Sequence, residues 1–305
     1  MRTRFRGVDV REGVLMLGPG GWAEFSPFWD YDARDSAPWW HCACEAAAGD
    51  WPRPVRNTVP VNVTIPAVDP DRAAALVRAS AGCRTAKVKV AEPGQSEAQD
   101  LDRVEAVRDA LGPGGRVRVD ANAAWDVDAA VRRIRDLDSA SGGLEYVEQP
   151  CATLEELRAV RRRVDVPIAA DESIRRAQDP LQVRLTGAAD IAVLKVGPLG
   201  GVRAALEIAE RCGLPVVVSS ALETSVGIAA GVALAAALPE LPYACGLATA
   251  ALLARDIVAS PLLPIDGSLP VRRPEPDLAL LAAVAADEAT AARWRARVAA
   301  VRPIL

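Results

Sequence analysis

From about residue 58 the chain alternates short apolar runs with longer amphipathic stretches. The apolar runs are rich in Val and Ile, which is typical of buried strands, and the stretches between them carry Ala, Leu, Arg and Glu at helical spacing. The pattern predicts strands at 61–66, 85–90, 116–122, 144–149, 167–172, 190–196, 215–220 and 244–248. It predicts helices near 70–81, 96–111, 126–139, 153–163, 178–186, 200–212 and 225–238.

Strands that alternate with single helices indicate a parallel sheet. Eight of them close naturally into a barrel, so we expect an α/β fold with a modified (β/α)8-type barrel, of about (β/α)7β form. An open doubly wound sheet is the alternative, but the Gly-rich dinucleotide loop after the first strand is missing. Helix starts support the assignment, since Asp126, Thr153 and the pair Asp179-Pro180 can cap helices, and Glu156 completes a capping box with Thr153.

The segments on either side of this alternation have a different pattern. Residues 5–17 and 21–28 are expected to be strands around a glycine-rich turn, and a Trp- and Ala-rich helical stretch follows them. Residues 275–302 have an Ala- and Arg-rich helical pattern. We therefore expect a small α+β capping domain of residues 1–57, to which 264–305 returns, on a barrel domain of residues 58–263.

The composition is that of an ordinary soluble globular protein, with 50% hydrophobic and 25% charged residues and a net charge of −4 over 305 residues. Interspersed charge of both signs argues against a nucleic acid or an anionic membrane as partner. No apolar segment follows the basic N-terminus, so we expect no signal peptide, and no uncharged apolar run reaches the ~18 residues of a membrane span. The six scattered cysteines favour a reduced, cytoplasmic protein.

Lysine is almost absent from the chain, which makes its few positions informative. Of the 36 basic residues only Lys87, Lys89 and Lys195 are lysines, and all three lie inside predicted strands. Arginine stays charged at any working pH, whereas a lysine amine can be pushed toward neutrality and then take a proton or form a Schiff base. Surface lysines seldom lie in Val- and Ile-rich runs, so we expect these three to serve chemistry.

Acidic residues stand near the ends of three neighbouring predicted strands, where barrel enzymes carry out their chemistry. They are Asp120, Glu148 and Asp171. Carboxylates that converge repel one another unless protons or a divalent cation neutralise them. Oxygen ligands without His or Cys favour Mg²⁺ or Mn²⁺. Pairing of these carboxylates with nearby arginines is the structural alternative.

The predicted barrel places the lysines around these carboxylates. Lys89 and Lys195 lie on strands four apart in an eight-stranded barrel, so they face each other across it. Lys87 and Lys89 alternate onto the same face about 7 Å apart, and at an effective dielectric of about 20 their repulsion is about 2 kcal/mol, which lowers the pKa of one amine. A cation between two such amines suits removal of a proton from the carbon next to a carboxylate.

The order of these motifs on successive strands resembles that of the enolase superfamily: Lys-x-Lys, Asp-x-Asn, Glu-Gln-Pro, Asp-Glu-Ser and a single Lys. The two-lysine arrangement resembles the muconate-lactonising branch, and the resemblance covers about residues 58–270. It implies that Asp120, Glu148 and Asp171 bind Mg²⁺, with Mn²⁺ as a substitute, and that Lys89 is the acid/base. Lys195 would hold its charge over the enolate face.

Within this branch the chain most resembles the dehydratases of menaquinone synthesis, which act on a small cyclohexadiene carboxylate. The residues expected to contact the substrate are Lys87, Arg118, Asn122, Ser219 and Gly246. A buried Arg118 needs an anionic partner, which is either the substrate or a neighbouring carboxylate such as Glu148 or Glu172. Glu172 itself is expected to be a partner in the barrel wall rather than a metal ligand.

Several alternatives stay open at this point. An N-acylamino-acid racemase or a muconate cycloisomerase would share the same machinery, whereas the family's dipeptide epimerases carry an Asp-x-Asp that residues 246–249 lack. A metal-free Schiff-base aldolase and a non-catalytic binding barrel are the alternatives from other classes. The sequence does not fix the oligomeric state, and a monomer is compatible with it. Tryptophans of the capping domain either fill its core or cover an apolar ring of the substrate; they are Trp22, Trp29, Trp39, Trp40 and Trp51.

Overall fold

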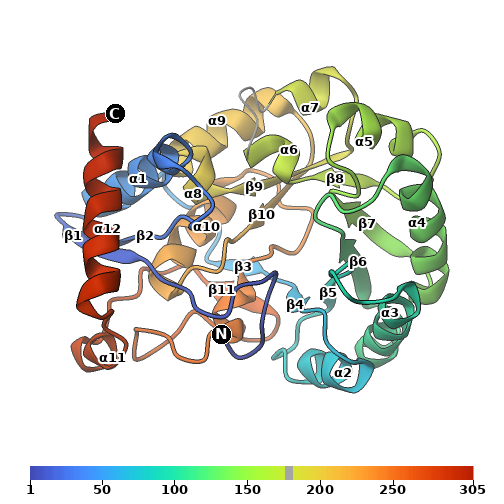
Figure 1. Cartoon of the computed structure of the whole chain (residues 1–305), viewed down its shortest axis with the longest axis horizontal. Helices are drawn as coiled ribbons and strands as arrows, with labels where there is room; N and C mark the ends of the chain where they lie inside the picture. The colour runs from blue at the N-terminus through green and yellow to red at the C-terminus, as the bar shows by residue number, and fades with distance from the viewer. Residues whose placement is uncertain (176–180, 305) are drawn as a thin grey trace.

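In the computed structural model, which describes residues 1–175 and 181–304, a curled parallel sheet forms the centre of the larger part of the molecule (Figure 1). Its strands are β4 Val63–Ile65, β5 Thr85–Lys89, β6 Arg116–Asp120, β7 Leu144–Glu148, β8 Ile168–Ala170, β9 Ile191–Lys195 and β10 Val216–Ser219. They are hydrogen-bonded in the order β10-β9-β8-β7-β6-β5-β4, and all of the pairs are parallel. The first seven predicted strands are therefore confirmed, each somewhat shorter than predicted.

The predicted eighth strand, at 244–248, is not a regular strand. Cys245 and Gly246 make isolated parallel bridges to Val61 and Ser219, which lie at the two edges of the sheet. The ladder stops there because a glycine has no side chain to pack and the 3₁₀-helix η1 begins at once, over Ala248–Leu252. The two bridges nevertheless join the edges of the sheet, so a barrel of about (β/α)7β form is the observed architecture.

Helices connect the strands and cover the outside of the sheet. They are α2 Pro70–Arg78, α3 Glu97–Leu111, α4 Val127–Ser141, α5 Leu154–Arg161, α6 Glu172–Arg175, α7 Gln182–Leu185, α8 Val196–Leu199, α9 Val202–Cys212 and α10 Ser225–Ala237. Asp126 caps α4 and Thr153 forms a capping box with Glu156, as predicted. The pair Asp179-Pro180 lies outside the described residues. The predicted helix at 178–186 is present in the described chain only as α7.

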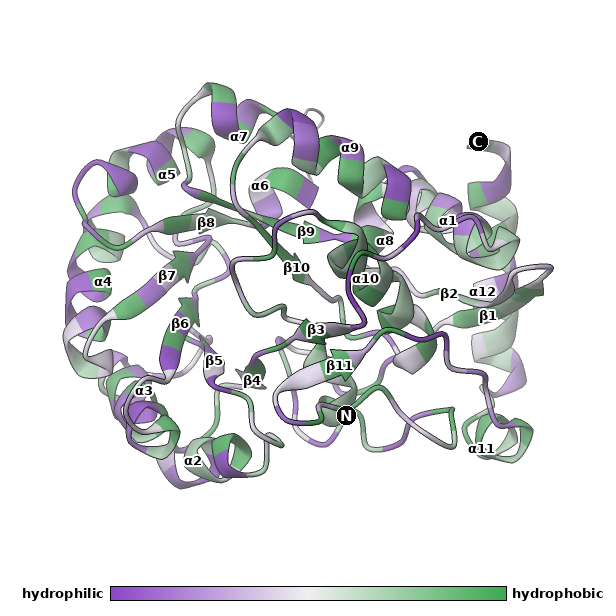
Figure 2. Cartoon of the chain, turned by 180° about the vertical axis from the view of Figure 1, so that it is seen from behind, coloured by the Kyte–Doolittle hydropathy of each residue, from purple (hydrophilic) through white to green (hydrophobic). Residues whose placement is uncertain are grey.

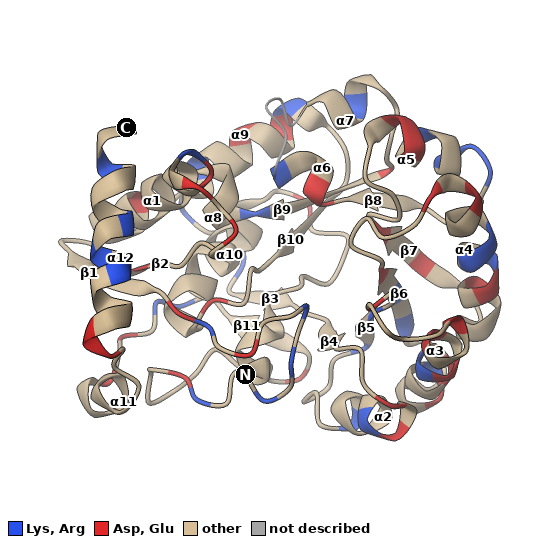
Figure 3. Cartoon of the chain, viewed as in Figure 1, with Lys and Arg blue, Asp and Glu red and all other residues tan. Residues whose placement is uncertain are grey.

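The hydropathy of these elements explains the layering. Strands β8, β9 and β10 are mainly hydrophobic, whereas α2 to α5 carry hydrophilic residues on their exposed turns (Figure 2). Acidic and basic residues are interspersed on these outer helices (Figure 3). Helix α10 is the exception, since nearly all of its residues are buried and apolar. No helix within residues 1–175 and 181–304 has the length and apolar character that a membrane span requires.

The capping domain, called the lid below, packs at one side of the barrel (Figure 1). Its elements are the antiparallel strands β1 Val14–Gly18 and β2 Gly21–Phe25, helix α1 Ala33–Ala48, and the C-terminal elements α11 Leu278–Ala283, α12 Glu288–Val301 and η2 Arg302–Ile304. The predicted strand at 5–17 is too long, because Phe5 and Val8 form a separate tight bridge. The predicted helix at 275–302 is two helices, because Asp287 caps α12 anew.

A short antiparallel ribbon links the two parts. It pairs β3 Thr58–Pro60 with β11 Ser268–Pro270. The domain boundaries proposed at 57/58 and 263/264 fall just before these two strands. Leu269 is fully buried in the core of the barrel, so the C-terminal segment touches the barrel before it returns to the lid.

Candidate active site

A cavity of about 340 Å³ opens between the lid and the carboxyl ends of the barrel strands. All three lysines of the chain line it, together with Asn122, Ser219 and Gly246. Lys89, Lys195 and Ser219 are the last residues of β5, β9 and β10, so the strands themselves aim these side chains into the cavity. The structure thus brings most of the predicted site residues to one place.

Two of the predicted acidic residues lie directly beneath the lysine amines of β5. Asp120 and Glu148 are register partners on β6 and β7, and each is at most 1% exposed. The Lys87 Nζ donates to the Glu148 Oε1 at 2.9 Å and lies 3.3 Å from the Asp120 Oδ2. The Lys89 Nζ donates to the same Oδ2. One carboxylate oxygen of Asp120 therefore faces two amines.

The third acidic residue is held from the opposite side of the barrel. The Lys195 Nζ donates to the Asp171 Oδ2 at 2.5 Å, and the Arg175 Nε donates to the Asp171 Oδ1 at 3.1 Å. Among the three carboxylates this is the one arginine pair in the described chain. Lysines rather than arginines therefore neutralise the cluster, and the alternative of arginine pairing holds for Asp171 alone.

Burial and neighbouring charges separate the two amines of β5. Burial lowers the pKa of Lys89 and outweighs the attraction of Asp120, while the charge of Lys87 adds to the decrease. Burial acts on Lys87 in the same direction, but Glu148 and Asp120 outweigh it and raise the pKa of Lys87. Burial, followed by the charge of Asp120, raises the pKa of Glu148 to about 7. Lys89 is accordingly the amine that gives up its proton more readily.

Asn122 fixes the position of Lys89. Its Oδ1 accepts a hydrogen bond from the Lys89 Nζ at 2.8 Å, and its Nδ2 donates to the Glu172 Oε1 at 3.1 Å. Asn122 has a positive φ of 46°, which asparagine tolerates better than most residues. The Arg175 Nη2 donates to the same Glu172 oxygen at 2.7 Å, so Glu172 pairs with Asn122 and Arg175 in the cavity wall.

Ser219 and Gly246 form the opposite wall of the cavity. The two residues are bridged across the edge of the sheet, and the Gly246 N donates to the Val218 O at 2.8 Å. A Cβ atom added to Gly246 would lie 2.7 Å from the Ser219 Oγ. Glycine is therefore required for the close approach that leaves the Ser219 hydroxyl at the cavity surface.

Comparison with known proteins decides the family. The model described as "Enolase C-terminal domain-like" matches residues 71–280, and that described as "Enolase N-terminal domain-like" matches residues 1–47. The o-succinylbenzoate synthase of Thermobifida fusca (strain YX) is 68% identical over 302 residues, which are 99% of this chain and 93% of that protein. The chain belongs to the o-succinylbenzoate synthase family of the enolase superfamily.

Further relatives agree with this assignment. The o-succinylbenzoate synthase of Mycolicibacterium smegmatis is 54% identical over the whole chain and 94% of that protein. Among solved structures, the L-Ala-D/L-Glu epimerase from Bacillus subtilis has a TM-score of 0.68 at 28% identity, covering 78% of this chain and 70% of that one. Muconate cycloisomerase from Pseudomonas fluorescens has a TM-score of 0.67 at 30% identity, covering 75% and 66%.

Members of this superfamily generally use a divalent metal ion. In the arrangement described here, no three acidic, histidine or cysteine side chains of residues 1–175 and 181–304 come close enough together to hold one. The donor chemistry still fits, because the carboxylates offer only oxygen, which Mg²⁺ prefers. The Glu148 Oε2 is buried without a hydrogen-bond partner, which is costly unless a cation or proton meets it.

Arg118 lies deeper in the barrel than the other residues expected to contact the substrate. It faces the barrel interior as predicted, but it is fully buried one layer below the cavity and does not line it. Its Nε donates to Glu145, and its Nη1 donates to the Ala244 O at 2.7 Å and the Tyr146 hydroxyl at 3.2 Å. Arg118 thus pairs with a neighbouring carboxylate, which is one of the two expected arrangements, but the partner is Glu145 rather than Glu148 or Glu172. A contact between Arg118 and the substrate stays a prediction.

Of the lid residues that reach the cavity, the sequence pointed to Trp39 and missed the other aromatic residues. Phe5, Phe28, Tyr31 and Trp39 line it, and the Phe5 ring lies 5.2 Å from the Lys89 Nζ. Of the five tryptophans named in the sequence analysis only Trp39 is among the lining residues, while the others pack within the lid or between the lid and the barrel. The lid core and the cavity roof therefore share the aromatic residues.

Proposed function

We propose that this protein acts as an o-succinylbenzoate synthase, a carbon–oxygen lyase that dehydrates a hydroxylated cyclohexadiene carboxylate in menaquinone synthesis. The observation that carries the proposal is the pair Lys89 and Lys195, which line one cavity from opposite sides in a chain of this family. A base on one side and a positive charge on the other suit a reaction that begins with removal of a proton from the carbon next to a carboxylate.

Lys89 carries the proton in both halves of the reaction. As a neutral amine it takes the proton from the ring carbon next to the carboxylate, and as an ammonium it returns that proton to the departing hydroxide on the neighbouring carbon. One water leaves, the ring becomes aromatic, and Lys89 is neutral again. Its lowered pKa and its hydrogen bond to Asn122 keep the amine ready and oriented for both steps.

Asp120, Glu148 and Asp171 are the residues that would hold Mg²⁺, with Mn²⁺ as a substitute. When bound, such a cation offsets the negative charge that develops on the substrate carboxylate. Lys195 lies opposite Lys89, and its ammonium adds to that stabilisation from the other face. Because Lys195 keeps its charge throughout, it supplies electrostatics rather than proton transfer.

The remaining contacts orient the substrate. Lys87 lines the cavity with its amine on Glu148 and Asp120, and the Ser219 hydroxyl and the backbone at Gly246 would meet the substrate from the opposite wall. Phe28 and Trp39 offer apolar surface to the ring. We further propose that the protein works in the cytoplasm on this small carboxylate, without a nucleic-acid or membrane partner and as a monomer.

A racemase of N-acylamino acids is the second candidate, because Lys89 and Lys195 place an amine on each face of the cavity. The experiment compares kcat/KM of the purified protein for the cyclohexadiene substrate and for N-succinyl amino acids, with and without EDTA followed by Mg²⁺. We expect metal-dependent dehydration that exceeds racemisation by orders of magnitude. Comparable kcat/KM values on both substrates would contradict a single function. Full activity in a metal-free sample would contradict the proposed requirement for a metal ion.

A further inference from the structure

Two carboxylates of the lid cap two helices of the barrel. Glu24 on β2 accepts hydrogen bonds from the first turn of α10: from the Thr224 N at 3.1 Å, the Thr224 Oγ1 at 2.5 Å and the Gly227 N at 3.2 Å. Glu45 on α1 accepts from the Val202 N at 2.6 Å and the Arg203 N at 3.0 Å, at the start of α9. A negative charge at a helix N-terminus satisfies free N–H groups and meets the positive end of the helix dipole.

The cap supplied by Glu45 is a docking contact away from the substrate. Helix α9 has Gly201 as its N-cap residue, which has no side chain to cap the helix, and a Cβ there would lie 2.6 Å from the Glu45 Oε2. Val202 and Arg203 do not line the active-site cavity. Glu45 therefore binds the lid to the barrel through residues that do not line the active-site cavity.

The cap supplied by Glu24 acts on a helix whose preceding loop forms the cavity wall. Residues 219–222, called the wall loop below, all line the cavity. Lid contacts hold this loop too, since the Arg11 Nη2 donates to the Ala221 O at 3.1 Å. The Glu223 Oε2 accepts from the Ala221 N at 2.7 Å, and Leu222 is held at a positive φ of 65°. The loop conformation is thus fixed at both Ala221 and Thr224 by groups that face the lid.

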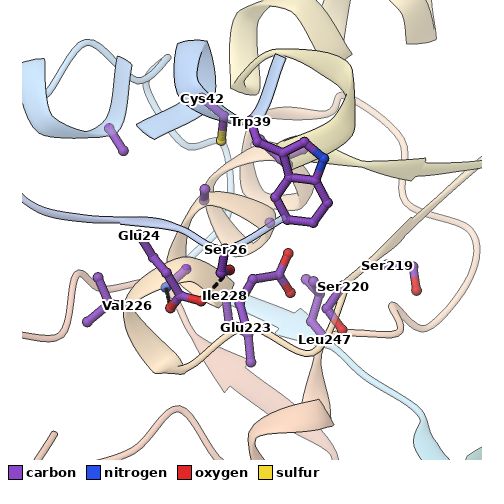
Figure 4. A pocket seen from close by; sticks show the side chains of 16 residues that line it. Glu24, Ser26, Trp39, Cys42, Ser219, Ser220, Glu223, Val226, Ile228 and Leu247 are labelled. Atoms are coloured by element: carbon purple, nitrogen blue, oxygen red, sulfur yellow. Dashed lines mark hydrogen bonds between the residues drawn. The ribbon is translucent and has the colours of Figure 1, made fainter. Parts of the chain in front are cut away.

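The Glu24 carboxylate and the wall loop border the same small cavity. A small cavity of about 20 Å³ is bounded by Glu24, Glu223, Trp39, Ser219 and Ser220. Figure 4 shows the two carboxylates and the Trp39 ring around this space, with the two serines at its far side. A displacement of the Glu24 side chain would therefore be passed to Ser219 and Ser220 through one layer of side chains.

We propose that Glu24 is a positioning residue of the substrate site: by capping α10 from the lid, it fixes the wall loop so that substrate binding depends on the docked lid. The inference rests on the proposed function and adds a residue to it. Lys89 lies on β5, away from the wall loop that follows β10, so Glu24 acts on affinity and not on proton transfer.

The variant Glu24→Gln removes the charge at nearly unchanged volume. The amide oxygen can keep the hydrogen bonds from Thr224 and Gly227 while the NH₂ donates to the Ser26 hydroxyl, so the variant removes mainly the charge at the start of α10. Glu45→Gln is the matched control, because it makes the same change at the other lid cap. We compare kcat and KM for the cyclohexadiene substrate, and the melting temperature, of both variants.

We expect both variants to lose stability, and Glu24→Gln alone to raise KM about tenfold with kcat changed less than about twofold. An unchanged KM in Glu24→Gln, an equal rise in Glu45→Gln, or a loss confined to kcat would overturn the proposal. Thr224→Val replaces Glu24→Gln if that variant does not fold, with the same expected rise in KM. It removes the hydroxyl that donates to Glu24 and that also accepts from the Val226 N as the N-cap of α10. A wild-type protein that does not turn over this substrate would instead defeat the proposed function.

Discussion

The contact between Gly246 and Ser219 permits a test in which the structure sets the expected result. In Gly246→Ala the new Cβ would lie 2.7 Å from the Ser219 Oγ and 3.4 Å from the Ser219 Cβ. The first distance is too short for any real contact, whereas the second is ordinary van der Waals contact. The methyl group therefore collides with the hydroxyl alone, and the hydroxyl must rotate away from the cavity surface.

The cost of this change follows from two terms. Loss of the proposed hydrogen bond between Ser219 and the substrate costs about 0.5–1.5 kcal/mol. Fitting a methyl group into a packed wall costs about 1–3 kcal/mol, and this second term lowers kcat/KM only as far as the crowding displaces the bound substrate. Rotation of the hydroxyl relieves part of the second term. We therefore expect kcat/KM for dehydration to fall about 10- to 100-fold, which corresponds to about 1.4–2.7 kcal/mol.

A double-mutant cycle measures whether this reasoning is right. Initial rates of product formation give kcat/KM for Gly246→Ala, Ser219→Ala and the double variant. Because Ser219→Ala removes the atom with which the methyl collides, we expect the double variant to match Ser219→Ala within about twofold, so the two losses are strongly non-additive. Losses that simply add would refute the collision and the assignment of Gly246 to this wall.

Two further predictions concern stability and thiol exposure. Arg118→Met breaks a buried ion pair with Glu145 and should lower the free energy of unfolding by about 3–5 kcal/mol. Arg116→Met breaks an exposed pair with the same carboxylate and should lower it by at most about 1 kcal/mol. Equal losses for the two variants in urea unfolding would contradict the buried placement of Arg118. All six cysteines are free and only Cys44 is not buried, so a thiol reagent should label Cys44 alone in the native protein. Rapid labelling of several thiols would contradict the burial of the other five cysteines.

Local sequence patterns predicted the barrel well. The strands β8, β9 and β10 are short, mainly apolar runs, and the caps at Asp126 and Thr153 involve residues only three positions apart. The polar residues at the strand ends could be gathered into one site because parallel strands bring their carboxyl ends to the same edge. Such features depend on neighbours in the sequence and on one topology.

The features that were missed depend on contacts between distant segments. The partner of Arg118 is Glu145 because β6 and β7 have an irregular register between Val117 and Arg118, which no local pattern reveals. Glu24 and Glu45 cap helices about 200 and 160 residues further along the chain, so neither looks like a cap in the sequence. The break before α12 did have a local signal, since the Asp287 side chain accepts from the Thr290 N at 2.7 Å.

The central claim is that Lys89 carries the proton, and its replacement by arginine tests this most directly. Arginine keeps the positive charge but cannot become a neutral base, so Lys89→Arg should lower turnover of the cyclohexadiene substrate by at least about 100-fold. Lys195→Arg should lose less, because that position supplies charge. Both variants should keep the wild-type circular dichroism spectrum and bind Mg²⁺. A folded Lys89→Arg protein that forms o-succinylbenzoate at the wild-type rate would contradict the account.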